Sequence, residues 1–156
     1  FGGNSMACAA GLAALEVILE ERLSERAAEL GAYFISGLKE LQQKYSLLKE
    51  VRGLGLLIGL EFEQPQGWLD KLSGGKLSET AREYTGAMVA GELLNKHGII
   101  TAYTLNNPNV IRLEPPLIVE KADLDRVVDA LADIFERSRN FFSLAMETGK
   151  NLLKLK

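Results

Sequence analysis

Arg112 is the side chain whose position in the sequence most clearly requires an anionic partner. It stands within the apolar residues 110–113, and Pro115 and Pro116 follow directly. A buried charge without a partner is very costly, so an arginine in a buried strand needs an anion beside it. Its planar guanidinium can hold a carboxylate through two hydrogen bonds, which suits an acid substrate. The alternative is a structural ion pair with Glu114.

The other polar residues suggest less chemistry. No spacing in the sequence forms a nucleophile–base pair, a pair of catalytic carboxylates or a metal site. His97, the single histidine, stands beside Gly98 at a predicted helix end, where a histidine is electrostatically favourable without any catalytic role. Gly53 and Gly55 form a weak phosphate-loop signal, because a dinucleotide-binding loop follows a strand and opens a helix. Tight backbone packing beside a bend explains these glycines better.

Composition limits the class of protein. The chain has 156 residues, enough for one domain with a real core, and its 47% hydrophobic and 25% charged residues are ordinary for a soluble domain. A net charge of −3 gives no support for nucleic-acid or membrane binding. The single cysteine, Cys8, cannot form an internal disulfide or a cysteine-rich metal site, which fits a reducing compartment and predicts a cytoplasmic protein. We expect neither a membrane-spanning segment nor a signal peptide.

The first half of the chain predicts two helices and a strand. Asn4 is a good N-cap for a helix rich in small residues, which neighbouring elements could approach closely. Ser24 is the predicted N-cap of a second helix. Residues 51–62 predict a glycine-rich bend and then a buried strand. The apolar stripe of the second helix consists of Leu30, Phe34, Leu38, Leu41 and Tyr45.

The second half predicts a surface insertion, a helix, a hairpin and further helices. Residues 64–78 are punctuated by glycine and proline, and Ser78 would cap a helix that ends at His97. Residues 99–103 and 110–113 predict an antiparallel hairpin around an asparagine-rich turn. An amphipathic helix from about residue 124 and another over 140–154 follow. The fold class is therefore α+β, a short antiparallel or mixed sheet packed with helices.

Three segments of the sequence resemble a known family. They are Phe1-Gly2-Gly3-Asn4 with residues 6–10, Val51-Arg52-Gly53-Leu54-Gly55 with Gly59, and Ile111-Arg112-Leu113-Glu114-Pro115-Pro116-Leu117. In this order they are similar to segments of the class III aminotransferases, pyridoxal 5'-phosphate (PLP) enzymes of fold type I. The likeness extends to about residue 137. Residues 104–107 most resemble the members that act on putrescine, whereas acetylornithine and ornithine aminotransferases share less of that stretch.

The resemblance implies how the chain would be organised. Residues 1–22 would be an interdomain loop and helix, and residues 23–156 a C-terminal small domain with an insertion at 64–78. A large domain upstream would hold most of the PLP and the lysine that carries it, so this chain would contain no catalytic residue. Phe1, Gly2, Gly3 and Asn4 would lie against the cofactor in a homodimer. Ser5 stands where the family usually has proline, which leaves a helix start possible.

The resemblance also implies a reaction. PLP acts as an electron sink while an amino group moves from a diamine or ω-amino donor, such as putrescine, to a keto acid such as 2-oxoglutarate. Arg112 would hold a carboxylate of the acid, and the chain alone would be inactive. The alternatives are an acetylornithine or ornithine aminotransferase, a mutase or decarboxylase on the same scaffold, or a non-catalytic binding module if the chain exists alone.

Overall fold

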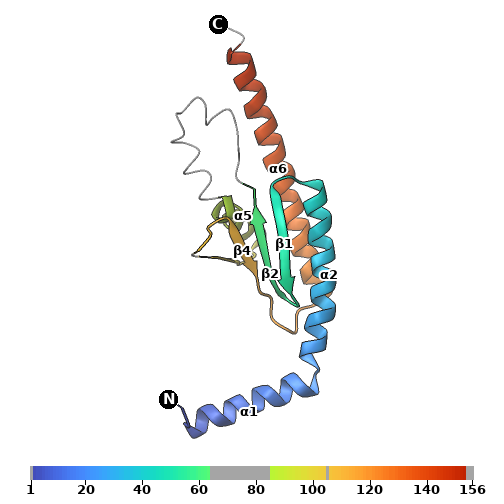
Figure 1. The fold of residues 1–156 in the computed structure, drawn as a ribbon, viewed down its shortest axis with the longest axis vertical. Helices are drawn as coiled ribbons and strands as arrows, with labels where there is room; N and C mark the ends of the chain where they lie inside the picture. Colours follow the sequence, from blue (N-terminus) through green and yellow to red (C-terminus); the bar gives the residue numbers. More distant parts are fainter. Residues whose placement is uncertain (1, 64–84, 105, 154–156) are drawn as a thin grey trace.

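The computed structural model describes residues 2–63, 85–104 and 106–153 (Figure 1). None of the helices in these ranges is long and apolar enough to cross a membrane. The elements in chain order are α1 (Ser5–Glu20), α2 (Leu23–Lys44), β1 (Leu48–Leu54), β2 (Leu57–Phe62), α5 (Thr85–His97), β3 (Ala102–Tyr103), β4 (Val110–Leu113) and α6 (Lys121–Leu153).

The strands form one antiparallel sheet in the order β1-β2-β4-β3, which confirms the predicted α+β class. Val51, Leu60 and Ile111 occupy one row across three strands, and all three are buried. The neighbouring row consists of Arg52, Gly59, Arg112 and Ala102. Because successive residues of a strand point to opposite faces, this second row lies on the other side of the sheet.

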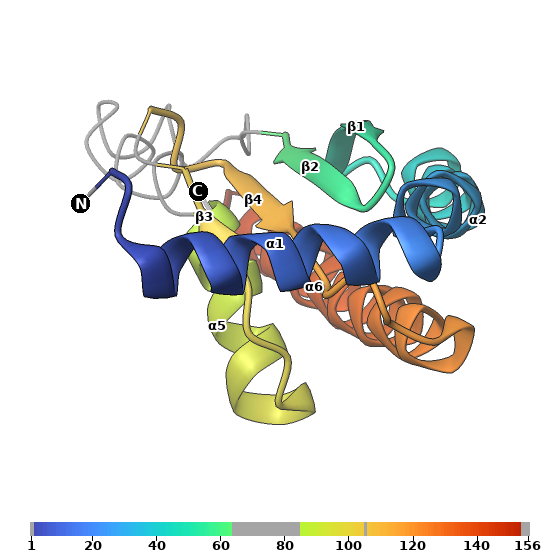
Figure 2. The same cartoon turned by 90° about the horizontal axis from the view of Figure 1, so that it is seen from below.

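The described helices that pack on the sheet all lie on one of its faces. Figure 2 shows α5 and α6 on one side of the strands, with α2 beside β1. The apolar stripe predicted for the second helix is confirmed, since Leu30, Phe34, Leu38, Leu41 and Tyr45 are all in the core cluster. Phe135 of α6 completes the core by packing edge-to-face against Tyr45 and Phe62. Among the described residues no helix covers the opposite face of the sheet, and we call it the open face.

Helix α1 begins as predicted but leaves the body of the molecule. The Asn4 side chain accepts hydrogen bonds from the backbone N–H groups of Met6 (3.0 Å) and Ala7 (3.3 Å). No residue of α1 is buried, and Figure 1 shows this helix running away from the foot of α2. The chain turns sharply at Arg22, whose φ is 50°. Helix α2 therefore starts without a side-chain cap, and the prediction of Ser24 as N-cap is wrong.

Three predicted elements differ from the observed ones. Residues 51–62 contribute to two strands, since β1 and β2 form a hairpin whose turn is Gly55, at φ 56°, and Leu56. The strand predicted for 99–103 consists only of Ala102 and Tyr103, although the antiparallel hairpin with β4 is confirmed. Helix α6 is one continuous helix, because residues 136–140 contain no glycine or proline to interrupt it. The predicted insertion 64–78 and the Ser78 cap lie outside the described residues.

Candidate functional site: an arginine on the open sheet face

Arg112 lies on the open face of β4 and is not buried. Ile111 and Leu113 on either side of it point into the core, whereas the Arg112 side chain is 47% exposed. Its Nη1 atom lies 3.2 Å from Oε1 of Glu114. The prediction of a buried arginine is therefore wrong, because no helix in the described part of the chain covers this face of the sheet. The predicted ion pair with Glu114 is present, at a position where solvent and a ligand can reach both groups.

Small residues flank Arg112 on both neighbouring strands. Gly59 of β2 and Ala102 of β3 stand directly opposite it. A Cβ atom on Gly59 would contact Cγ1 of Val110 (3.7 Å) and Cγ of Arg52 (3.8 Å), so a side chain there would occupy the space between the two arginines. The absence of large cross-strand neighbours leaves the guanidinium of Arg112 accessible. The sequence did not show this, because the flanking residues can be recognised only once the register is known.

Arg52, the second arginine of the row, is held by carboxylates. Its Nη1 atom donates to Oε2 of Glu61 (2.7 Å) and also bonds Glu50, while Lys49 Nζ lies 2.7 Å from Oε1 of Glu61. The hydrogen bonds from Lys49 and then Arg52 lower the pKa of Glu61, and Glu61 in turn raises the pKa of Lys49 and of Arg52. Arg52 is thus held in place by ion pairs, whereas Arg112 has a single carboxylate partner among the described residues, Glu114, at a longer distance.

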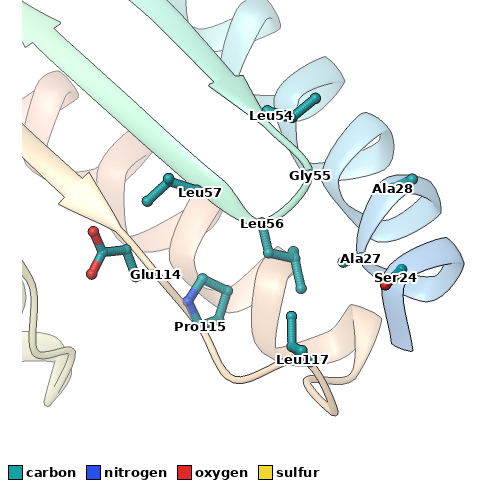
Figure 3. A pocket seen from close by; sticks show the side chains of 10 residues that line it. All are labelled: Ser24, Ala27, Ala28, Leu54, Gly55, Leu56, Leu57, Glu114, Pro115 and Leu117. Atoms are coloured by element: carbon teal, nitrogen blue, oxygen red, sulfur yellow. The ribbon is translucent and has the colours of Figure 1, made fainter. Parts of the chain in front are cut away.

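A groove of about 530 Å³ adjoins Glu114 at the end of the sheet (Figure 3). It lies between the start of α2, the β1–β2 turn and the segment that follows β4. In Figure 3, Glu114 lies on the side of Leu57 and Pro115, across from Ser24 and Ala28 on α2. The lining residues are Ser24, Ala27, Ala28, Leu54, Gly55, Leu56, Leu57, Glu114, Pro115 and Leu117. Most of them are apolar, and Glu114 is the charged member of the lining.

The predicted cofactor segment lies at the far end of α1, away from β4 (Figure 1). Phe1 lies outside the described residues. Gly3 has a φ of 81°, and a Cβ atom on Gly2 or Gly3 would meet nothing within 4 Å. An open glycine loop that leads into a helix N-terminus suits a phosphate group. The open backbone of Gly2 and Gly3 leaves room for the phosphate of PLP, and this chain does not bring the segment together with Arg112.

His97 has a structural place at the end of α5. Gly98 adopts a φ of 66°, and its N–H bonds the carbonyl of Leu94 (3.1 Å), as expected for a C-cap glycine. Arg126 of α6 donates to the carbonyl of His97 (2.6 Å). The His97 Nε2 atom lies 3.2 Å from Oδ2 of Asp133, whose pKa is lowered mainly by Arg137. These contacts join α5 to α6.

Comparison with known proteins gives the family. The family model described as aminotransferase class-III matches residues 1–135. The chain belongs to this family. It is 38% identical over 135 residues to the acetylornithine aminotransferase of Methanocaldococcus jannaschii, and 40% identical over 135 residues to an ornithine aminotransferase of Geobacillus sp.. Each alignment covers 86% of this chain but only 28% of the relative, so the chain spans less than a third of the length of these relatives.

Solved structures agree with the family assignment. The acetylornithine aminotransferase of Elizabethkingia anophelis superposes with a TM-score of 0.69 at 32% identity, covering 88% of this chain and 30% of that one. The ornithine aminotransferase of Toxoplasma gondii gives a TM-score of 0.68 at 30% identity, covering 90% of this chain and 29% of that one, and its structure has partial occupancy of PLP. Class III aminotransferases are PLP-dependent. These comparisons confirm the resemblance to the family and the fold class; the putrescine specificity stays a prediction.

Proposed function

We propose that this chain forms the C-terminal part of a PLP-dependent class III aminotransferase. Residues 1–22 would link it to a large domain, and residues 23–156 would be the small domain. The observation that carries the proposal is the placement of Arg112, accessible on the open face between Gly59 and Ala102. A guanidinium there can hold a carboxylate in two-point contact without first losing a large solvation energy.

The reaction would move an amino group from an ω-amino donor to a keto acid such as 2-oxoglutarate. The names of the relatives favour an ornithine-type or acetylornithine-type donor over the putrescine-like donor predicted from the sequence. Arg112 would bind and orient a carboxylate of the acid substrate. A donor without a carboxylate would depend much less on this side chain.

The cofactor would supply the electron sink for the reaction when it is bound. Among the residues of this chain, Gly2, Gly3 and Asn4 would contact its phosphate, with Phe1 beside them. The lysine that carries PLP would belong to the large domain. The protein would act as a homodimer in the cytoplasm, with small-molecule amines and keto acids as its partners.

A direct assay tests this proposal. The protein in its native length, supplied with PLP, is incubated with 2-oxoglutarate and with ornithine, N-acetylornithine or putrescine in turn, and glutamate is measured. We expect glutamate from at least one of these donors. If none yields glutamate but a product forms without keto acid, the scaffold carries a mutase or decarboxylase. If no product forms under any condition, the chain is a binding module and the proposal is wrong.

A further inference from the structure

Helix α6 continues well beyond the part of the chain that matches the family. The family model ends at residue 135, and the alignments with relatives cover 135–137 residues, whereas α6 runs on to Leu153. Phe135 is the last residue of α6 in the core cluster. Figure 1 shows the end of α6 projecting beyond α2 and the sheet. We call residues 139–153 the arm, which is about 22 Å long at a rise of about 1.5 Å per residue.

The sequence of the arm repeats the apolar spacing of the core half of α6. Leu124, Leu131 and Phe135 follow one another at steps of seven and four residues, and all three are buried. Such steps return to the same side of a helix, so the apolar positions of the arm lie on the side that faces the sheet further down. No other described element reaches the arm beyond the end of the sheet (Figure 1). The same steps continue through the arm at Phe142, Met146 and Leu153.

A flat surface cannot cover the arm from this side. The sheet lies on the same side of α6, so a membrane in contact with the whole arm would overlap the body of the molecule (Figure 1, Figure 2). A single helix, about 10–12 Å wide, can lie along the arm and stop at the end of the sheet. A second copy of the protein supplies such a helix, with the same apolar spacing.

We infer that two copies of the protein associate through their arms, which pack antiparallel about a two-fold axis near Ala145. Such a pair is closed, because each arm uses the same surface to cover the other. The two bodies lie at opposite ends of the pair, so neither obstructs the arm of the other. Phe141 and Phe142 alone can bury about 300–500 Å². The leucines and the methionine of the arm bring this area toward the roughly 800 Å² per partner that a stable interface buries.

The charges of the arm suit this arrangement. Residues 136–156 contain five basic and two acidic residues, so their net charge is +3, while the chain as a whole carries −3. Antiparallel packing brings Lys150 to the C-terminal end of α2 in the second copy, where the helix dipole is negative. Glu136 lies at this end too, since it accepts a hydrogen bond from Tyr45 (2.9 Å). The nearby Arg137 is already paired with carboxylates of α5 and α6.

Sedimentation of the native-length protein tests the inference through its mass. The wild type should have twice the mass of a variant that ends at Ser138, which keeps the core half of α6. Phe142→Arg with Leu153→Arg should halve the mass as well. The matched control Ser143→Arg adds the same charge at a position that helical spacing puts on the opposite side of the arm, so it should keep the wild-type mass. Equal masses for the wild type and the truncated variant would overturn the inference.

Crosslinking tests the antiparallel arrangement in proteins that keep the arm. In a Cys8→Ser background, Ala145→Cys lies near the two-fold axis and should form a disulfide between copies under mild oxidation, located by mass spectrometry. Leu152→Cys lies about 10 Å from the axis, so it should not link to itself. Linkage at both positions would mean parallel arms and would contradict the inference.

A vesicle assay covers the remaining occupant of the arm. If the truncated variant keeps the wild-type mass but no longer co-sediments with phosphatidylserine vesicles, the arm binds a membrane and the inference is wrong. We expect no arm-dependent binding to these vesicles. None of these measurements needs turnover, so association through the arm and the proposed transamination can fail independently.

Discussion

Gly31 of α2 and Gly55 of the β1–β2 turn touch through their backbones. A Cβ atom on Gly31 would overlap the carbonyl of Gly55, and Gly55 itself holds a φ of 56° against Ala27. This contact sets the hairpin against the helix, and so positions the turn that lines the groove. It also gives Gly55 a role in packing. For the Gly53-x-Gly55 spacing, the sequence favoured such a packing role over phosphate binding.

Gly31→Ala should destabilise the fold by about 1–3 kcal/mol, because the added methyl group forces the helix and turn apart. Urea unfolding of the two proteins measures the difference. Gly37→Ala in the same helix is the matched control, since a Cβ atom there would meet Cγ2 and Cγ1 of Val128 at 3.4 and 3.8 Å, which are ordinary contact distances. It should be neutral or up to about 1 kcal/mol stabilising. Equal losses in both variants would show that the Gly31–Gly55 contact is not specific.

Periodicity explains which parts of the fold could be predicted. The stripe from Leu30 to Tyr45 shows the helical period in the sequence itself, and the structure buries all of it. The N-cap of α2 was predicted at the wrong residue. The N-cap is Arg22 in a left-handed conformation, and its side chain makes no capping hydrogen bond that the sequence could indicate. Strand β1 was predicted as a glycine-rich bend before a single strand, because Gly55-Leu56 is not one of the strong hairpin dipeptides.

The site was less predictable than the fold. The importance of Arg112 follows from residue type and from the family resemblance, but its exposure depends on which face of the sheet the helices cover. That choice is made by contacts between residues far apart in the chain. The same holds for Gly59 and Ala102, which become neighbours of Arg112 only through the register of three strands. Local patterns carry no information on such pairings.

The charge cluster around Glu61 predicts a dependence of stability on pH. Hydrogen bonds from Lys49 and Arg52 lower its pKa below the ordinary value of 4.5. Its contribution is therefore fully present above pH 4.5 and is lost as the pH falls through the lower pKa of the folded state. Glu61→Gln should cost about 1 kcal/mol at pH 7, from two ion pairs worth roughly 0.2–1 kcal/mol each. Urea unfolding across the acid range should show this difference shrinking toward zero.

Lys49→Gln provides the companion measurement for the cluster. It removes one of the two donors to Glu61, so it should take away part of the same pH-dependent difference. The double variant should then cost less than the sum of the two single variants. A Glu61→Gln difference that stays constant from pH 7 to pH 3 would mean that the ion pairs add nothing to stability.

The exposed face of α1 predicts association of the 156-residue chain in solution. Leu12, Leu15 and Leu19 lie on one side of the helix and are 59%, 58% and 74% exposed. Apolar patches of this kind are usually covered by another surface. Sedimentation should show the average mass rising with concentration, and Leu12→Gln with Leu19→Gln should reduce the rise. Met88→Gln on α5, which is also exposed, is the control and should not. A monomer at all concentrations would contradict this expectation.

The 156-residue chain by itself should not hold PLP at a specific lysine or catalyse transamination. The family resemblance places the cofactor lysine in the large domain, outside these residues. Titration with PLP, followed by visible absorbance and by mass spectrometry of reduced samples, should show only scattered modification of surface lysines. One modified lysine per chain, together with glutamate formation, would place the catalytic site within these residues.

Arg112→Lys in the native-length enzyme separates the roles of the arginine. Lysine keeps the charge but loses the planar two-point contact with a carboxylate. The half-reaction with the keto acid should weaken by the value of one or two charged hydrogen bonds, about 1.5–3 kcal/mol each. The half-reaction with a diamine should change much less, because that donor has no carboxylate. Single-turnover measurement of each half-reaction gives the two effects separately.

The losses of rate that Arg112→Lys causes in the two half-reactions decide which role the Arg112 side chain has. A loss confined to the keto acid assigns the side chain to the acid substrate. Equal losses in both halves, with the protein still folded, would assign it to the geometry of the shared cofactor. No loss in either half would leave only the ion pair with Glu114, which at 47% and 41% exposure adds little to stability. In that case another cation of the complete enzyme must hold the acid.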